Sequence, residues 1–383
     1  MLKNKNILII TSSLESGVID KSVIDIATIL NEKDFNITVI SAGGKMVKEL
    51  KKCGIEHIQL PINSNDFFVI RRNMKKISEI SSERQISMIH TFTPQSSFYG
   101  FKISKIFNIP YITSFLKIYK KSFWHLTNNR INYLTKGDII IVPSDFMASF
   151  IQITYKVPSE KIAIIPQWID TDVYNSNNVS AERIISTASD LRIPEDHFII
   201  TTIAKMEKTR GQTNLITAIS KLPNEIKQRI RCLIIGSYKE HKRYKNELTN
   251  LSQKLGVEGI IHIAGDCSDT PALLMLSDVY IATNIEPKAS QITVLEAQSI
   301  GRPIIASNIG STSEYILDND TCKTYDPRNI DELVKAILWS MEINEDKREE
   351  ISKKLSANIR LNFSKNLLPQ KIGSIYDYVL EKK

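Results

Sequence analysis

The sequence is poor in cysteine and has no long hydrophobic run. Its four cysteines, Cys53, Cys232, Cys267 and Cys322, are scattered and form no Cys-x-x-Cys pair. This spacing argues against a zinc cage or a disulfide framework and predicts a reducing compartment, the cytoplasm. No stretch approaches 18 consecutive apolar residues, so no membrane-spanning helix is expected. The apolar run at residues 7–10 is too short for the core of a signal peptide and is expected to be a buried strand.

Acidic residues are scarce in the first half of the chain, which carries all of the net charge of +8. Residues 1–170 hold 22 Lys and Arg against 14 Asp and Glu, whereas residues 171–383 hold 28 of each. Two interpretations of this excess are equally open. The basic residues could form ordinary solvated faces, or they could form a surface for an anionic partner such as a phosphorylated glycolipid or an acidic membrane. No basic and aromatic recognition motif is present, so nucleic acid is not expected as a partner.

Short apolar runs alternate with helical patterns along both halves of the chain. At 383 residues the chain is too long for one compact core, and two domains are expected. The predicted strands are residues 7–10, 37–41, 88–91, 111–115 and 139–142, then 198–203, 232–235, 260–264, 279–283 and 304–307. Strands alternating with helices predict parallel sheets covered on both faces. The sequence therefore predicts an α/β protein with two Rossmann-like, doubly wound domains, 1–170 and 171–370, facing a central cleft, with a polar linker at 175–180.

The most informative segment runs from Glu286 to Pro303. It reads E-P-K-A-S-Q-I-T-V-L-E-A-Q-S-I-G-R-P. This resembles the donor-site signature of the retaining glycosyltransferases of family 4, roughly E-P-E-A-F-G-x-x-x-x-E-A-x-x-x-G-x-P. Glu296 matches the second carboxylate of that signature, and the resemblance implies that it binds the ribose hydroxyls of a nucleotide. Lys288 stands where the first carboxylate is expected.

The remaining donor-side positions follow from the same resemblance. They are Ser290 and Gln291, which replace the usual Phe-Gly, Ile292 beside them, and Gly310 and Ser311. The last two open a G-S-x-x-E turn similar to the family's G-G-x-x-E, whose backbone donors could help to hold phosphate. For Glu296, an acid in the first turn of a helix is the alternative interpretation.

Two cations lie in a second motif of the second half. Residues 203–212 read I-A-K-M-E-K-T-R-G-Q and resemble the family's G-R-L-x-x-x-K-G. Lys205 and Arg210 are therefore the candidate catalytic residues, since two positive charges can neutralise a departing diphosphate. The order of Arg and Lys is exchanged relative to the family, which moves the planar guanidinium to the other position. Taken alone, two such residues would be expected in solvent.

Two first-half motifs suggest an acceptor side. Residues 14–21 contain Gly17 and resemble the family's G-G-V-E-R turn, although an ordinary strand-to-helix turn would look the same. His90 lies in I-H-T-F-T, which resembles H-A-R-S; the alternative is a structural histidine. Residues 110–117 resemble P-F-V-T-T-F-H-G, but Leu116 and Lys117 replace the last two residues.

The resemblance implies the GT-B fold and metal-independent, retaining transfer from a nucleotide-sugar donor to a glycan or glycolipid acceptor. The nearest relatives in character are bacterial enzymes of lipopolysaccharide core and envelope glycans. No cofactor is expected, because the nucleotide sugar is a substrate. The D-x-D at residues 170–172 could instead bind a divalent metal, but relatives use this position structurally. In the family, the last helix, here 371–383, crosses back to the first domain.

Several alternatives stay open at the sequence level. Lys288 could suit an acidic donor sugar, Glu286 could substitute for the missing carboxylate, or the sugar subsite could be degraded. The chain is accordingly expected to be an active transferase or, alternatively, a catalytically impaired nucleotide-sugar-binding or scaffold protein, with other two-domain enzymes such as epimerases as a third class. Residues 67–77 mix apolar and basic side chains and could either contact the inner face of the cytoplasmic membrane or form an ordinary surface helix.

Overall fold

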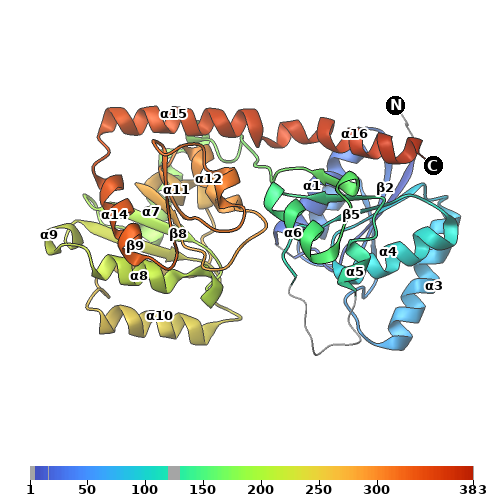
Figure 1. The fold of residues 1–383 in the computed structure, drawn as a ribbon, viewed down its shortest axis with the longest axis horizontal. Helices are drawn as coiled ribbons and strands as arrows, with labels where there is room; N and C mark the ends of the chain where they lie inside the picture. The colour runs from blue at the N-terminus through green and yellow to red at the C-terminus, as the bar shows by residue number, and fades with distance from the viewer. Residues whose placement is uncertain (1–4, 16, 120–129, 383) are drawn as a thin grey trace. The chain divides into compact units, whose positions relative to one another are not determined.

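The computed structural model describes residues 5–15, 17–119 and 130–382. Its contacts divide the chain into two compact units (Figure 1). Unit 1 comprises Met1–Pro166 and Leu367–Lys383, and unit 2 comprises Gln167–Asn366. Each unit has its own sheet, and all the strand pairs in both sheets are parallel. The predicted pair of doubly wound domains is confirmed.

The sheet of unit 1 has the strand order β3-β2-β1-β4-β5-β6-β7. Its strands are β1 (Asn6–Ile10), β2 (Asn36–Ser41), β3 (Glu56–Gln59), β4 (Met88–Thr91), β5 (Tyr111–Ser114), β6 (Ile139–Val142) and β7 (Ile162–Ile164). Its helices are α1 (Val18–Glu32), α2 (Val47–Lys52), α3 (Phe67–Glu83), α4 (Pro94–Phe107), α5 (Ile131–Leu134), α6 (Asp145–Tyr155) and α16 (Leu368–Glu381). The strand order reverses direction between β1 and β4, which is where ligands lie in such sheets.

The sheet of unit 2 has the order β10-β9-β8-β11-β12-β13 and reverses between β8 and β11. Its strands are β8 (Phe198–Ile203), β9 (Ile230–Ile235), β10 (Ile261–Ala264), β11 (Val279–Ala282), β12 (Ile304–Ser307) and β13 (Cys322–Tyr325). Its helices are α7 (Ala181–Asp190), α8 (Gln212–Ser220), α9 (Asn224–Lys227), α10 (Lys242–Lys254), α11 (Thr270–Leu276), α12 (Ile292–Ile300), α13 (Thr312–Tyr315), α14 (Ile330–Met341) and α15 (Glu345–Asn362).

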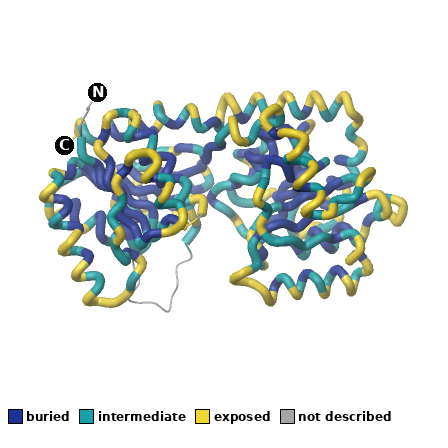
Figure 2. Tube along the Cα trace, turned by 180° about the vertical axis from the view of Figure 1, so that it is seen from behind, coloured by how far each residue is buried: buried dark blue, intermediate teal, exposed yellow. Residues whose placement is uncertain are grey.

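Burial of branched side chains explains why these runs are strands. Ile7, Leu8, Ile9 and Ile10 of β1 are all fully buried, because helices cover both faces of the sheet. Figure 2 shows the same contrast throughout both units, with strands buried and the outward faces of helices exposed. Helix starts are set locally: Asp66, for example, caps α3 by accepting a hydrogen bond from the Val69 backbone N–H at 2.8 Å.

Three strands were not predicted, namely β3, β7 and β13. Each lies at the edge of its sheet, and each contains residues that are not buried. A half-exposed edge strand lacks the continuous apolar run by which the central strands are recognised. The segment 175–180, predicted to be a linker, lies within unit 2 and contains a short 3₁₀ turn at Ser176–Asn178.

The last helix, α16, packs on α1 and belongs to unit 1, although unit 2 separates it in sequence from the rest of that unit. Within residues 5–15, 17–119 and 130–382, no helix is both long and apolar enough to cross a lipid bilayer.

Candidate functional site

The two predicted catalytic cations lie in the turn that follows β8, at the point where the strand order of unit 2 reverses. Met206 anchors this turn, because its side chain is fully buried and its backbone N–H donates to the Ser237 carbonyl at 3.0 Å. Lys205 is largely exposed, and its Nζ lies 3.7 Å from Glu240 Oε2. Arg210 ends a short 3₁₀ turn, Lys208–Arg210, and its side chain is about a third exposed. Both cations can therefore be reached from solvent.

Gly211 allows this turn to lie directly against the end of β11. Its backbone is left-handed, with φ of +66°, and a Cβ there would stand 2.0 Å from the Thr283 carbonyl oxygen. The Thr283 hydroxyl donates back to the Arg210 carbonyl at 2.6 Å. Only glycine fits both the left-handed conformation and the close contact with Thr283. The turn carrying Lys205 and Arg210 is therefore tied to the end of β11, which leads into the loop of residues 284–291.

The donor loop, residues 284–291, is held by a chain of amide and hydroxyl hydrogen bonds. Asn284 Oδ1 accepts from Arg210 Nη1 at 3.2 Å, and its Nδ2 donates to Gln291 Oε1 at 3.0 Å. Gln291 Nε2 in turn donates to Thr312 Oγ1 at 3.1 Å. Gln291 is thus a buried support of the loop. Ser290 beside it is partly buried.

The turn at Gly310 and Ser311 fixes the same loop from the other side. Gly310 has φ of +62°, and a Cβ there would lie 2.7 Å from the Lys288 backbone nitrogen. The Ser311 backbone N–H and hydroxyl both approach the Lys288 carbonyl, at 3.3 and 3.1 Å. The turn was predicted to help hold phosphate, and in the structure the two Ser311 donors contact the Lys288 carbonyl.

Lys288 lies beside Arg210 and beside Glu207, a carboxylate that was not predicted from the sequence. Its Nζ donates to Thr209 Oγ1 at 3.1 Å and lies 3.7 Å from Glu207 Oε1. Burial and the nearby Arg210 lower the pKa of Lys288, while Glu207 and Glu286 oppose that shift. The pKa of Glu207 is lowered in spite of its burial, because Thr209, Arg210 and Lys288 all favour its ionised form.

Glu207 could have been found from its spacing. It stands three residues before Arg210, and Arg210 Nε donates to its Oε1 at 3.1 Å. An acid and a base three residues apart often pair within one turn. The proximity of Lys288, by contrast, is set by tertiary structure alone.

Glu296 is buried in α12 and lies one turn into the helix. The helix begins at Ile292, and no acidic residue occupies its first turn, so the interpretation of Glu296 as a first-turn acid is wrong. Burial, followed by the adjacent Glu296 carboxylate, raises the pKa of Tyr174. Glu296 thus faces the Tyr174 hydroxyl. Ile292, the remaining donor-side position, packs on the neighbouring apolar cluster.

His90 was predicted on the acceptor side, and its placement corrects that prediction. It is fully buried; Nδ1 is 2.6 Å from the Tyr376 hydroxyl and Nε2 is 2.8 Å from Ser114 Oγ. Burial lowers its pKa to about 3, so the imidazole is neutral. With both nitrogens engaged inside the protein, the side chain is structural.

Gly17 precedes α1, and it was predicted on the acceptor side as the glycine of a turn before a helix N-terminus. Its N–H donates to Asp20 Oδ2 at 2.9 Å, and the N–H of Glu15 donates to the same oxygen at 3.1 Å. An internal carboxylate therefore already occupies this helix N-terminus. The glycine is not required by its backbone conformation, since φ is −83°.

The D-x-D segment forms a local turn. Asp170 Oδ1 accepts from the backbone N–H groups of Asp172 and Val173, at 3.1 and 3.2 Å. Among the residues that the structure describes, no group of three or more His, Cys, Asp or Glu side chains is placed to hold a metal ion.

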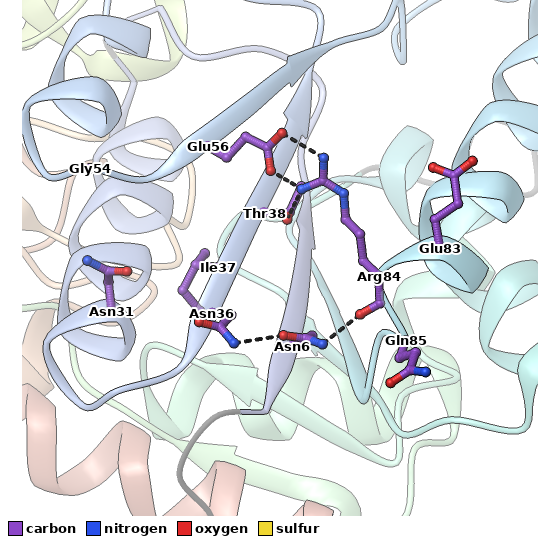
Figure 3. A pocket seen from close by; sticks show the side chains of 10 residues that line it. All are labelled: Asn6, Asn31, Asn36, Ile37, Thr38, Gly54, Glu56, Glu83, Arg84 and Gln85. Carbon is purple, nitrogen blue, oxygen red and sulfur yellow. Dashed lines mark hydrogen bonds and ion pairs between the residues drawn. The ribbon is translucent and has the colours of Figure 1, made fainter.

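A pocket of unit 1 lies at the amino-terminal ends of β1, β2 and β3 (Figure 3). The Arg84 guanidinium there pairs with Glu56 and donates to Thr38 Oγ1 at 3.0 Å. Asn36 Nδ2 donates to Asn6 Oδ1 at 2.9 Å. Ligands of doubly wound sheets lie at the opposite, carboxyl ends of the strands, and these charged groups are already paired, so we assign the pocket no ligand.

Two family models match the chain in succession. The model described as "Glycosyltransferase Family 4" matches residues 19–173, and that described as "Glycosyl transferases group 1" matches residues 186–357. Among curated proteins, a lipopolysaccharide 1,2-N-acetylglucosaminetransferase of Salmonella typhimurium is 22% identical over 231 residues, which are 59% of this chain and 58% of that protein. The chain thus spans about three fifths of the length of that relative.

Solved structures resemble the chain over nearly its whole length. A glycosyltransferase from Rickettsia africae superposes with a TM-score of 0.89 at 28% identity, covering 99% of this chain and 100% of that one. Anabaena HepE, solved in complex with UDP, has a TM-score of 0.84 at 20% identity, covering 97% and 100%. At 20% identity, the similarity to HepE shows the fold alone.

Proposed function

Because the chain belongs to the family 4 glycosyltransferases of GT-B fold, we propose that it transfers a sugar from a nucleotide-sugar donor to a glycan or glycolipid acceptor, with retention of configuration. The single observation that carries the proposal is the solvent-accessible pair Lys205 and Arg210 at the carboxyl end of β8, tied through Asn284 to the donor loop. The reaction needs no cofactor and no metal in this proposal, because the two cations supply the charge on which it depends.

The proposed chemistry is stabilisation of a leaving group. As the glycosidic bond breaks, negative charge accumulates on the departing diphosphate, and preorganised cations lower the barrier. Arg210 has five N–H donors, of which Glu207 and Asn284 take two, so the others can reach phosphate oxygens. Among the residues that the structure describes, the Lys205 ammonium is held by an exposed ion pair with Glu240, which costs little to break. Glu296 would bind the ribose hydroxyls, and the acceptor hydroxyl would attack the face from which the diphosphate leaves.

The names of similar proteins support an envelope substrate. The Salmonella relative is named for lipopolysaccharide synthesis, and HepE was solved with UDP. We therefore propose that the acceptor is a glycan or glycolipid of the bacterial envelope. Transfer from the nucleotide-sugar donor would take place on the cytoplasmic side of the membrane.

The surface of α3 supports peripheral membrane contact. Phe67 and Phe68 are 67% and 78% exposed at the start of the helix, and their rings contact each other. Arg71 and Arg72 are exposed one turn later. Aromatic side chains beside cations suit the interface of an anionic bilayer.

The test is thermal unfolding against UDP-, GDP-, ADP- and CMP-sugars and their free nucleotides, followed by assay of turnover. A ligand at 100 times its Kd should stabilise unit 2 by about 2.7 kcal/mol. Product formed from the stabilising donor should keep the donor's anomeric configuration by NMR. Absence of any shift across the panel would refute the proposal.

A second candidate is a nucleotide-sugar-binding or scaffold protein of the same fold without turnover. Lys288 at the position of an expected carboxylate is the observation that favours it. Stabilisation by sugar nucleotides without release of nucleoside diphosphate, in the presence of envelope glycolipids, would select this candidate over the transferase.

A further inference from the structure

Glu207 is the shared partner of three side chains at the donor loop. Its Oε1 accepts from the Thr209 hydroxyl at 2.8 Å and from Arg210 Nε at 3.1 Å, and Lys288 Nζ lies 3.7 Å away. Thr209 also accepts from Lys288 at 3.1 Å, so the four side chains form a closed network. The carboxylate thus comes from the turn after β8, while the donor loop supplies a cation.

One oxygen of this carboxylate remains available. In the described part of the chain, the side-chain hydrogen bonds and the ion-pair contacts of Glu207 are made by Oε1, and the side chain is 29% exposed. Oε2 can therefore accept hydrogen bonds from an incoming ligand. Despite burial, the Thr209 hydroxyl and the flanking cations lower the pKa of Glu207, so the group is an ionised acceptor at neutral pH.

The charge of Lys288 is already compensated. The side chain is only 19% exposed and faces Glu207 and Thr209. Burial and Arg210 lower its pKa, whereas Glu207 and Glu286 raise it. A lysine engaged in this way is a poor receptor for a second carboxylate, because that group would have to displace Glu207 from it.

We propose that Glu207 accepts hydrogen bonds from hydroxyls of the transferred sugar and that Lys288 is its counter-ion, so that the site takes a neutral rather than an acidic donor sugar. This inference rests on the proposed function, since it concerns the sugar of the same nucleotide-sugar donor. It also answers the question raised by the sequence: the carboxylate missing from the donor loop is supplied from the neighbouring turn.

The physical basis is the mismatch between hydroxyls and cations. Each sugar hydroxyl has a proton to donate, and lysine and arginine side chains have no acceptor for it, although they can donate to the hydroxyl oxygen. A hydrogen bond to a charged acceptor is also stronger than one to a neutral acceptor. A carboxylated sugar would instead bring a negative charge toward Oε2, where the two groups repel each other.

The experiment compares the affinity for a sugar nucleotide with that for its free nucleotide in the wild type and in Glu207→Gln. The main probes are UDP, UDP-glucose and UDP-glucuronate. GDP with GDP-mannose and ADP with ADP-glucose cover the other bases, and every affinity is measured by calorimetry. We expect the wild type to bind the neutral sugar nucleotide more tightly than the free nucleotide. In Glu207→Gln, the ratio of these two affinities should fall about tenfold. Glu240→Gln, which removes a carboxylate beside the other cation, should leave the ratio unchanged.

The ratio separates sugar recognition from a structural role. If Glu207 only positioned Arg210 and Lys288, its loss would weaken free nucleotide and sugar nucleotide equally, and the unchanged ratio would overturn the inference while leaving the proposed function standing. Tighter binding of UDP-glucuronate than of UDP-glucose by the wild type would overturn it as well. A wild type that binds none of the nucleotides would overturn both.

A charge exchange provides the complementary arm. Lys288→Glu alone sets two carboxylates against each other and should lower the affinity for the neutral sugar nucleotide. The double variant Lys288→Glu/Glu207→Lys places the carboxylate in the donor loop and a cation opposite it. It should recover most of the wild-type ratio of sugar-nucleotide to free-nucleotide affinity. Improved binding by Lys288→Glu alone would overturn the inference, because the lysine would then be a defect rather than a counter-ion.

Discussion

His90 and Tyr376 are joined by a 2.6 Å hydrogen bond between Nδ1 and the phenolic oxygen, although 286 positions separate them in the chain. Both side chains are fully buried, and the two rings also meet edge to face. The contact connects β4 in the middle of the sheet of unit 1 to the last helix. Since α16 carries Tyr376, this pair is one of the interactions that hold the helix on unit 1.

We predict that Tyr376→Phe destabilises unit 1 by about 1 to 3 kcal/mol, because it leaves a buried imidazole nitrogen without a partner. The measurement is thermal and urea unfolding. Tyr378→Phe, on the same helix but 45% exposed, is the control and should change stability little. Equal effects of the two variants would show that the buried hydrogen bond contributes nothing.

Acid should destabilise unit 1 through His90. Its pKa is about 3 in the folded protein and about 6.5 when unfolded, so below pH 6.5 the unfolded chain binds a proton that the folded chain does not. Stability is therefore complete above pH 6.5 and falls as the pH decreases toward 3, by roughly 2 kcal/mol at pH 5 from this group alone.

Comparison of Tm at pH 7.5 and pH 5 checks this prediction. His90→Gln should be less stable than the wild type at pH 7.5 but should show a smaller loss on acidification. His241→Gln, at an exposed position, should keep the wild-type loss. An identical acid response in His90→Gln and the wild type would rule out His90 as the source.

Substitution of Gly211 should destabilise unit 2 by more than the strain of a left-handed backbone alone would cause. We predict that Gly211→Ala costs at least about 2 kcal/mol more than Gly256→Ala in unfolding experiments. The two glycines have nearly the same φ, +66° and +64°, but a Cβ at Gly256 meets nothing within 4 Å. The difference between the variants isolates the contact with Thr283, and its absence would mean that the turn moves freely.

Loss of either proposed catalytic cation should slow turnover strongly without unfolding the protein. We expect Lys205→Ala and Arg210→Ala each to lower kcat by about 10²- to 10³-fold, since each removes charge stabilisation of the leaving group. Lys208→Ala removes an exposed cation of the same turn that pairs with Glu247, and serves as control. Turnover that survives in Lys205→Ala would refute the assignment of the diphosphate site.

Membrane contact through α3 should depend on its two exposed aromatic residues. In co-sedimentation with vesicles containing about a third anionic lipid, the variant Phe67→Ser/Phe68→Ser should bind several-fold less than the wild type. Ile153→Ser changes an apolar residue of α6 that is 71% exposed and is the control. If both variants bind equally, α3 is an ordinary surface helix. Neutral vesicles should bind weakly in all cases.

The central strands were predictable because burial on both faces demands continuous apolar runs, as at Ile7–Ile10 and residues 304–307. The edge strands were not, since β3 reads Glu-His-Ile-Gln and leaves its outer residues exposed. Pairing with β2, rather than its own composition, makes this segment a strand.

The candidate site was predictable only in part. The spacing of Lys205, Arg210 and Glu296 follows motifs that can be read along the chain. The contact of Glu207 with Lys288 and the burial of His90 could not be obtained in this way. Glu207 meets Lys288 across 81 positions of sequence, through a loop folded back by Gly310, and His90 looks the same in the sequence whether it faces solvent or a buried tyrosine.

The order of synthesis gives α16 a further significance. The ribosome makes the first 166 residues of unit 1, then all of unit 2, and only afterwards the helix that carries the partner of His90. Domains tend to fold as they emerge, the N-terminal one first. While the roughly 200 residues of unit 2 are translated, the surface that α16 covers and the His90 nitrogen that Tyr376 binds therefore lack this partner, so a segment made after unit 2 governs when the core of unit 1 is covered.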